Sequence, residues 1–346
     1  MPHQLVSIRS LIDITDYHIH GFASETIPAS PPNSDRFTAH ILSERANNAL
    51  LKVTLSLNPS LLVVAGWKVP LFVSTAKKVR TRLNIPIVAY SDTQWDGTLR
   101  QKLNCIISRW HLKKAFSHMW VAGIYQFEYA RRLGFAKEKI IMNALSCDVE
   151  KFSRAAKRKS EGHFPKNFLF VGRFVPEKGL AELLKAWTNI ENKESWTLTL
   201  VGSGAFDFTE YCNESIEVKS HMSHDSLIEE MKQSSCLILP SSFEPWALVI
   251  HEATAAGLPV IATNRCGANP HFIISNYNGF VIDFDPTEIE RALLKIIRAS
   301  HDELQQMSRR STQLAQSINP ELGTRNLISL LKQNPGQRRM LNSPEA

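Results

Sequence analysis

The sequence has few cysteines and no long apolar run. Its five cysteines are widely scattered and form no C-x-x-C pair, so we expect free thiols in a reducing compartment and no zinc site. Apolar runs such as LLVVAG at 61–66 are far too short to cross a bilayer. Asp13 and Asp16 interrupt the N-terminal stretch, which argues against a secretory signal. These features favour a cytoplasmic protein.

The composition is that of a globular protein with an excess of positive charge. At 346 residues the chain is long enough for two domains with their own cores. Hydrophobic residues make up 43% and charged residues 21%, which is ordinary for this class. The net charge of +7 favours polyanionic partners such as nucleotide diphosphates or acidic lipid surfaces, and a solvated basic surface fits equally well. Nucleic acid is not expected as a partner, because no motif beyond charge supports it.

Strand and helix patterns alternate along both halves of the chain, which predicts parallel sheets with helices on their faces. In the first half we expect strands at 61–65, 86–90, 119–122 and 139–142, helices at 35–57, 71–83, 99–116 and 124–133, and a further strand at 6–14. In the second half we expect strands at 168–171, 197–201, 236–239, 260–263 and 279–282, and helices at 180–187, 225–232, 287–298, 302–316 and 321–333, with another that ends near 256.

A polar, basic stretch separates the two alternating series. Residues 151–165 have little apolar content, so we expect them to link an N-terminal domain at 1–150 to a C-terminal domain at 166–318. A helix at 319–333 follows. The tail at 334–346 has no periodicity and is expected to be disordered.

The stretch CLILPSSFEPWALVIHEATAAGLPVIAT at 236–263 is typical of a strand–loop–helix–strand unit, whose ligand loops open at the carboxyl ends of strands. Glu244 lies in the loop, and Glu252 lies on the helix among apolar and small residues. A buried carboxylate needs hydrogen-bond partners, so we interpret Glu252 as a ligand-binding residue rather than a surface one. The adjacent His251 points in another direction, so an acid–base pair is not expected.

The loop in VGRFVPEKG predicts a phosphate site. Gly172 ends a strand, and Arg173 and Lys178 flank a short loop that opens a helix. Arginine offers a bidentate fork, lysine a point charge and the helix start its backbone donors, and all three suit a diphosphate. A surface turn with ordinary basic residues is the competing interpretation.

Backbone groups are expected to complete this site. In VGSG, Gly202 and Gly204 allow the backbone to approach a phosphate closely, although glycines at strand ends are common. The backbone amides around Trp246, Ala247 and Leu248 are placed to hold a phosphate at a helix start.

The unit at 236–263 resembles the E-x7-E region of retaining glycosyltransferases of the GT4 family, also called group 1. That region usually reads like EPFGLVxLEAMAAGxPVIA, and here it reads EPWALVIHEATAAGLPVIA. VGRFVPEKG likewise resembles the family's G-R-x4-K-G signature, in which the arginine and lysine bind donor phosphates. The resemblance implies that Glu252 binds two ribose hydroxyls and that Glu244 approaches the donor sugar.

The same resemblance implies an α/β fold of the GT-B type. In this fold two Rossmann-like domains, each with a parallel sheet, face a central cleft, and the final helices cross back to the first domain.

The first half departs from the family pattern. Many relatives have a histidine near the reacting sugar carbon, and IPIVAYSDTQWDG places Ser91 or Asp92 there. Asp92 is a candidate for orienting an acceptor or sugar hydroxyl, and an Asx turn is an equal alternative. The glycine-rich loop that usually follows the first strand is missing, since Gly21 stands alone in HIHGFAS. We therefore expect a first domain that is abbreviated or lacks its opening βα unit.

By resemblance, the chain is expected to be a retaining, hexosyltransferase-type glycosyltransferase. It would move a sugar from a nucleotide diphosphate sugar, with UDP or GDP as the nucleotide, to a hydroxyl of a glycan, a lipid-linked glycan or a small molecule, as in polysaccharide biosynthesis. No cofactor and no metal are expected, because Arg173 and Lys178 take the role that Mg²⁺ has elsewhere. Two alternatives stay open: a nucleotide-sugar epimerase of GT-B shape, and a catalytically degenerate protein that binds nucleotide sugars.

A basic stretch in the first half suggests one more partner. Lysines and arginines share the predicted helix at 99–116 with apolar residues that include Trp110. Such a helix could make peripheral contact with an anionic membrane at its cytoplasmic face. A solvated helix face is the more frequent outcome of this charge pattern.

Overall fold

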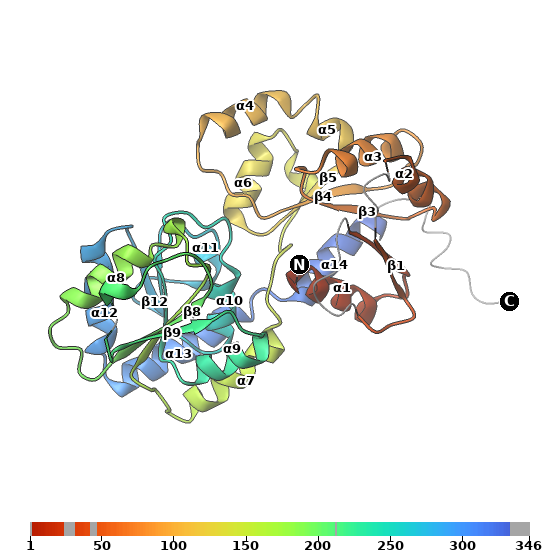
Figure 1. The fold of residues 1–346 in the computed structure, drawn as a ribbon. Helices are drawn as coiled ribbons and strands as arrows, with labels where there is room; N and C mark the ends of the chain where they lie inside the picture. Colours follow the sequence, from red (N-terminus) through yellow and green to blue (C-terminus); the bar gives the residue numbers. More distant parts are fainter. Residues whose placement is uncertain (1, 24–31, 42–46, 212, 333–346) are drawn as a thin grey trace. The chain divides into compact units, whose positions relative to one another are not determined.

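The computed structural model describes residues 2–23, 32–41, 47–211 and 213–332 (Figure 1). The chain divides into two compact units, residues 1–146 with 318–346, and residues 147–317. The tail at 334–346, expected to be disordered, lies outside the described residues. Both units contain parallel sheets with helices between their strands, so the predicted α/β class is confirmed.

The described part of the first unit is organised around four parallel strands in the order β3-β4-β5-β6. These are β3 (Leu62–Ala65), β4 (Ile87–Ser91), β5 (His118–Val121) and β6 (Ile140–Ile141). Between them in sequence lie helices α3 (Pro70–Arg80), α4 (Leu99–Ile107), α5 (Leu112–Ala115) and α6 (Ile124–Arg132), and the short 3-10 helix η1 (Lys137–Lys139). A separate parallel pair consists of β1 (Ile19–Ala23) and β2 (Phe37–Ile41), and α2 (Asn47–Ser56) leads into β3.

The core of this unit lies around β4 and β5, whose residues are all buried. A strand covered on both faces must be apolar along its length, which explains the run at the start of β4. Met119 of β5 packs in the same cluster as Phe116 and Leu133. In the register Ser91 pairs with Val121, so the two strands end at the same edge of the sheet.

The predicted strand at 6–14 is wrong. The segment belongs to helix α1 (Pro2–Ile14), which packs on helix α14 (Pro320–Lys332) within the first unit. Leu5 and Ile12 are buried seven residues apart, and Ser10 Oγ lies 2.8 Å from Thr324 Oγ1. The helix is favoured by a contact with the other end of the chain, which the local pattern does not contain.

Two further helix predictions for the first unit need correction. The segment 35–57 holds strand β2 as well as helix α2, and the segment 99–116 holds the two helices α4 and α5 with a turn between them. In both cases a continuous pattern of apolar residues was interpreted as one element.

The described part of the second unit holds six parallel strands in the order β12-β11-β10-β7-β8-β9. In this doubly wound order the chain begins at the central strand β7 and continues outward through β8 and β9. It then crosses to β10 on the other side of β7 and continues through β11 and β12. The strands are β7 (Asn167–Val171), β8 (Thr197–Gly202), β9 (Ile216–Ser220), β10 (Cys236–Leu239), β11 (Val260–Thr263) and β12 (Gly279–Ile282). The helices are α7 (Val149–Ser160), α8 (Leu180–Asn189), α9 (His224–Lys232), α10 (Leu248–Ala255), α11 (Asn269–Phe272), α12 (Pro286–Ile297) and α13 (His301–Ala315), with the 3-10 helices η2 (Pro176–Lys178) and η3 (Thr209–Tyr211).

The stretch 151–165, predicted as an interdomain linker, is instead largely helical and packed. Helix α7 begins after Asp148, whose carboxylate caps its first turn, and the helix packs on α9, α10 and α13. Phe152 is buried, and so is Lys159, whose ammonium donates to the Lys232 carbonyl (3.1 Å) at the end of α9. The prediction failed because alanines and the aliphatic stem of a lysine form much of the contact face.

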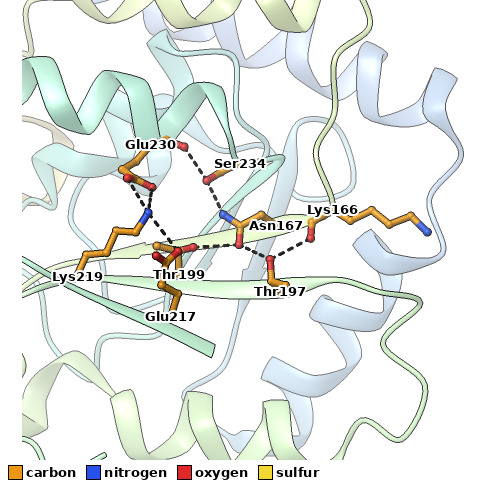
Figure 2. Close-up of polar contacts among 8 residues, drawn as sticks. All are labelled: Lys166, Asn167, Thr197, Thr199, Glu217, Lys219, Glu230 and Ser234. Atoms are coloured by element: carbon orange, nitrogen blue, oxygen red, sulfur yellow. Dashed lines mark hydrogen bonds and ion pairs between the residues drawn. The ribbon is translucent and has the colours of Figure 1, made fainter. Parts of the chain in front are cut away.

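A polar network ties the amino ends of β7 and β8 to α9 (Figure 2). The Asn167 side-chain amide lies 3.0 Å from Ser234 Oγ, and that hydroxyl donates to the Glu230 carbonyl (2.9 Å). Asn167 is also within hydrogen-bond distance of two threonine hydroxyls of β8. Lys219, nearer the carboxyl end of β9, reaches the Glu230 carboxylate (2.8 Å) and also ties this strand to α9. Internal hydrogen bonds thus occupy this edge, and ligand loops are expected at the opposite, carboxyl edge.

We predict that Gly202→Ala, at the end of β8, strongly destabilises the second unit. A Cβ atom at this position would lie 1.8 Å from the Gly172 carbonyl oxygen, so the strand ends would have to separate. We expect a loss of at least about 2 kcal/mol, seen as a lower midpoint of thermal unfolding. Gly172→Ala is the matched control, because its Cβ would meet side-chain atoms alone, the end of the Phe170 ring at 3.3 Å and the Lys178 side chain at 3.6 Å. Equal midpoints for the two variants would contradict this account.

Candidate functional site

Two loops meet where the strand order reverses between β7 and β10. The first contains η2, and the second runs from Pro240 to the start of α10. Gly179 has a φ of +69°, and a Cβ there would lie 2.0 Å from the Pro240 carbonyl oxygen. The Ser242 amide donates to the Glu177 carbonyl (2.9 Å). The loops therefore hold each other in place, at the point where doubly wound sheets bind their ligands.

An ion pair between Lys178 and Glu244 joins the same two loops. The side chains are 14% and 15% exposed, so both charges are largely removed from water, and each compensates the other. Arg173, in the first loop, is 70% exposed and lies 3.7 Å from Glu177. The predicted pair of cations thus consists of a held lysine and an exposed arginine.

Glycines at the strand ends let backbone pack against backbone. Gly172 follows β7 and Gly202 ends β8, while Gly204 has a φ of +154° and a Cβ there would lie 2.3 Å from the Phe174 carbonyl oxygen. The Phe174 amide donates to the Ser203 carbonyl (2.7 Å), which continues the pairing past the strands. The predicted glycines therefore lie together at the carboxyl edge, and tight packing is itself one reason for glycine at two of these positions.

Helix α10 begins directly after the second loop. Ala247 has a left-handed φ of +72°, and it stands where the usual group 1 motif has a glycine, the residue that adopts this conformation without strain. Among the described residues no side chain caps the helix, which starts at Leu248. The Trp246 carbonyl accepts a hydrogen bond from the Ala268 amide (2.7 Å), which holds the end of the loop in place. The uncapped amides at this helix start are suited to an anion.

Glu252 is a buried carboxylate on α10, with 6% of the residue exposed. Burial raises its pKa to about 7. Within the described residues the carboxylate forms no hydrogen bond, and His224 Nε2 lies 3.9 Å from its Oε1. Burial lowers the pKa of His224, so this ring is mainly neutral near pH 7 and leaves the carboxylate uncompensated. The site thus holds the unused acceptors that the ligand-binding prediction for Glu252 requires.

The adjacent His251 is satisfied by the protein. Its Nδ1 accepts from the Cys147 amide (3.1 Å), which leaves Nε2 as the donor to the Ala315 carbonyl (2.9 Å). The ring also stacks on Phe272 with centroids 4.1 Å apart. Both ring nitrogens hold α10 in the unit, which agrees with the interpretation that His251 forms no acid–base pair with Glu252.

Asp92 belongs to the first unit, where it is exposed in the loop after β4 and its carbonyl accepts from the Gln126 side chain (3.2 Å). The turn there uses the Ser91 hydroxyl, which accepts from the Thr93 amide (3.2 Å). His224 was not predicted as a site residue. The sequence contains nothing that indicates that this histidine, at the start of α9, lies near Glu252 of α10.

The first unit also contains a cavity of about 530 Å³, which is lined mainly by apolar side chains from α1, β1, β3 and α14. None of the predicted site residues lines it.

Residues 153–314 match the family model described as glycosyl transferases group 1. This segment, just under half of the chain, is similar to the group 1 glycosyltransferases. An uncharacterised glycosyltransferase of Methanocaldococcus jannaschii is 34% identical over 146 residues, 40% of each chain. The amylovoran biosynthesis glycosyltransferase of Erwinia amylovora is 30% identical over 161 residues, 44% of each chain. The chain spans less than half the length of these curated relatives.

The architecture around the group 1 segment resembles a solved structure of the Escherichia coli trehalose-6-phosphate protein bound with UDP-2-fluoro glucose. The TM-score is 0.76, and the match covers 96% of each chain at 13% identity, which establishes the fold alone. The predicted GT-B fold of two Rossmann-like domains is confirmed. In the described part of the chain, no helix has the length and apolar character needed to cross a membrane. No group of three or more His, Cys, Asp or Glu side chains among the described residues is placed to hold a metal ion.

We predict that Glu252→Gln stabilises the ligand-free protein at about pH 8 and has little effect at about pH 5. The folded pKa of about 7 lies above the ordinary value of 4.5, so the folded state favours the protonated acid. The contribution of Glu252 to stability therefore falls as the pH rises between these values, whereas glutamine keeps the shape of the neutral acid at every pH. The difference in thermal midpoint between variant and wild type should grow across this range.

Glu191→Gln, at an exposed position, is the control and should show no such trend. A difference for Glu252→Gln that stays constant with pH would rule out a buried titrating carboxylate.

Proposed function

We propose that this protein is a retaining glycosyltransferase that moves a sugar from a nucleotide diphosphate sugar to a hydroxyl acceptor. The observation that carries the proposal is the grouping of a lysine–glutamate pair, an exposed arginine and an uncapped helix start at the reversal of strand order. A nucleotide diphosphate requires cations and backbone donors, and the hydroxyls of its sugars require acceptors. The second unit contains both kinds of group at one edge of its sheet.

Glu252 is proposed to bind the ribose of the donor. Its carboxylate is buried without a hydrogen bond from the described residues, and two neighbouring hydroxyls would supply the partners that burial removes. Hydrogen bonds to the charged form lower a carboxyl pKa, so a bound donor should shift the pKa of Glu252 down from about 7. Glu244 is proposed to accept a hydroxyl of the donor sugar, and the amides of Ala247 and Leu248 to hold a phosphate at the start of α10.

Arg173 and Lys178 are proposed to stabilise the diphosphate as the glycosidic bond breaks. Lys178 is already held beside the strand ends by Glu244, so little reorganisation is needed when negative charge develops. Arg173 is exposed, and its ion pair with the exposed Glu177 (3.7 Å) is weak, so the guanidinium can move onto the diphosphate. We propose front-face attack in which the leaving phosphate takes the acceptor's proton, a route that needs no side-chain nucleophile.

The acceptor is proposed to be a glycan or lipid-linked glycan, with Asp92 of the first unit orienting its hydroxyl. The Erwinia relative, which is named for amylovoran biosynthesis, supports this class. A UDP-sugar donor is supported by the Escherichia coli structure, which holds UDP-2-fluoro glucose. GDP-sugars are the alternative donors, and a thermal-shift comparison of UDP-, GDP- and ADP-sugars separates them.

We predict that Arg173→Ala with Lys178→Ala lowers sugar transfer by at least about a thousandfold, because both cations facing the leaving group are lost. The assay measures nucleotide diphosphate released from UDP- and GDP-sugars in the presence of a panel of hydroxyl acceptors. Lys185→Ala, an exposed lysine on α8, is the matched control and should leave the rate unchanged. Thermal midpoints establish that the variants remain folded.

Other outcomes would contradict the proposal in different ways. Unaltered turnover in the double variant would overturn the assigned roles. Release of UDP or a rearranged sugar without any acceptor would indicate an epimerase. Donor binding without turnover across the acceptor panel would indicate a nucleotide-sugar-binding protein.

A further inference from the structure

Helix α4 carries its apolar side chains on the outside. Leu99, Leu103 and Ile106 are 82%, 57% and 63% exposed, and their spacing of four and three residues places them on one face. Trp110, in the turn that follows, is 57% exposed. A surface helix of a globular protein normally has polar residues on its outer face. Single exposed apolar residues are common, but a row along one short helix indicates an interaction surface.

The opposite face of α4 is polar and anchored to the first unit. Gln101 is buried. Its side chain donates to the Gln94 carbonyl (2.7 Å) and accepts a hydrogen bond from the Asp96 amide (2.8 Å). The Thr98 hydroxyl caps the helix by accepting from the Gln101 amide (3.3 Å). Ser108, just past the helix, is fully buried. The outward orientation of the apolar row is therefore fixed by hydrogen bonds on the inner face.

Positive charge accompanies the apolar row. Arg100, Lys102 and Arg109 are exposed on the same stretch, and the Arg109 guanidinium lies 5.5 Å from the centroid of the Trp110 ring. Two further exposed lysines follow on α5. The sequence from 97 to 127 contains no aspartate or glutamate. The surface thus combines large apolar side chains with cations. Residues 97–127 contribute no carboxylate that would repel an anionic partner.

We propose that this face docks on the surface of an anionic lipid membrane. Leu99, Leu103 and Ile106 enter the boundary between headgroups and acyl chains, and the lysines and arginines remain among the phosphates. Trp110 suits the same interface, because its ring is apolar and its N–H is polar. A lipid surface offers acyl chains and negative charge together, which matches both halves of this face. The docking surface is independent of the proposed donor site and would bring the protein to membrane-bound acceptors.

The test is co-sedimentation of the full chain with vesicles. Wild-type protein should bind vesicles of phosphatidylcholine with about one-third phosphatidylglycerol, bind pure phosphatidylcholine much less, and dissociate as salt is added. Leu103→Ser with Ile106→Ser should lower the affinity for the anionic vesicles at least about tenfold. Arg100→Gln with Lys102→Gln and Arg109→Gln should reduce it similarly and weaken the salt dependence, since the two lysines of α5 remain. Ile274→Ser, at an apolar position of the second unit that is 52% exposed, is the control.

The two variant sets keep the proposal open to refutation even when one of them folds poorly. Wild-type protein that ignores both kinds of vesicle would overturn it, and so would equal binding to neutral and anionic vesicles. A dimer in solution that the Leu103→Ser, Ile106→Ser variant abolishes would assign the face to a second copy of the chain and refute membrane docking.

Discussion

The close packing of two loops at the carboxyl edge of the second sheet is the constraint on which the candidate site depends. Gly179 allows the loop after β7 to reach the Pro240 carbonyl, and the Lys178–Glu244 pair compensates the charges that this approach withdraws from water. The loops lie on either side of the strand-order reversal, so their contact sets the positions of Arg173 and the start of α10. Removing Glu244 would take away the carboxylate that compensates the Lys178 ammonium at low exposure, which is costly.

Burial gives two neighbouring residues of α10 opposite characters. His251 uses both ring nitrogens in hydrogen bonds to backbone, so its burial is fully satisfied. Glu252 is buried almost as deeply, yet its carboxylate forms no hydrogen bond within the described residues and its pKa is raised to about 7. A protein gains no stability from such a carboxylate at neutral pH. The cost is consistent with a group reserved for a ligand that donates hydrogen bonds.

Much of the second sheet could be predicted from sequence, because strands covered on both faces are short apolar runs. This holds for β7, β8, β10, β11 and β12, whereas the edge strand β9 (IEVKS) is largely exposed and gave no such run. Helices α1 and α7 were missed for a different reason. Their contact faces are completed by α14, and by α9, α10 and α13, which are distant in sequence, so no local pattern records them. For the segment 99–116 the sequence predicted a basic helix with apolar residues and offered membrane contact as the less frequent outcome. The outward direction of the apolar row of α4 required the structure, since composition does not say which face of a helix is anchored.

The sequence by itself determined the family resemblance, the order of most elements and the residue types at the candidate site. Those properties are local: a motif, a strand run or a glycine is complete within a few residues. Only the tertiary structure decided that Lys178 pairs with Glu244, 66 residues away, and that Glu252 lies beside His224 without a hydrogen bond. Pairing and burial depend on which elements the sheet order brings together. Pairing and burial also explain why Arg173 is exposed and Lys178 is held by Glu244, although both belong to one sequence motif.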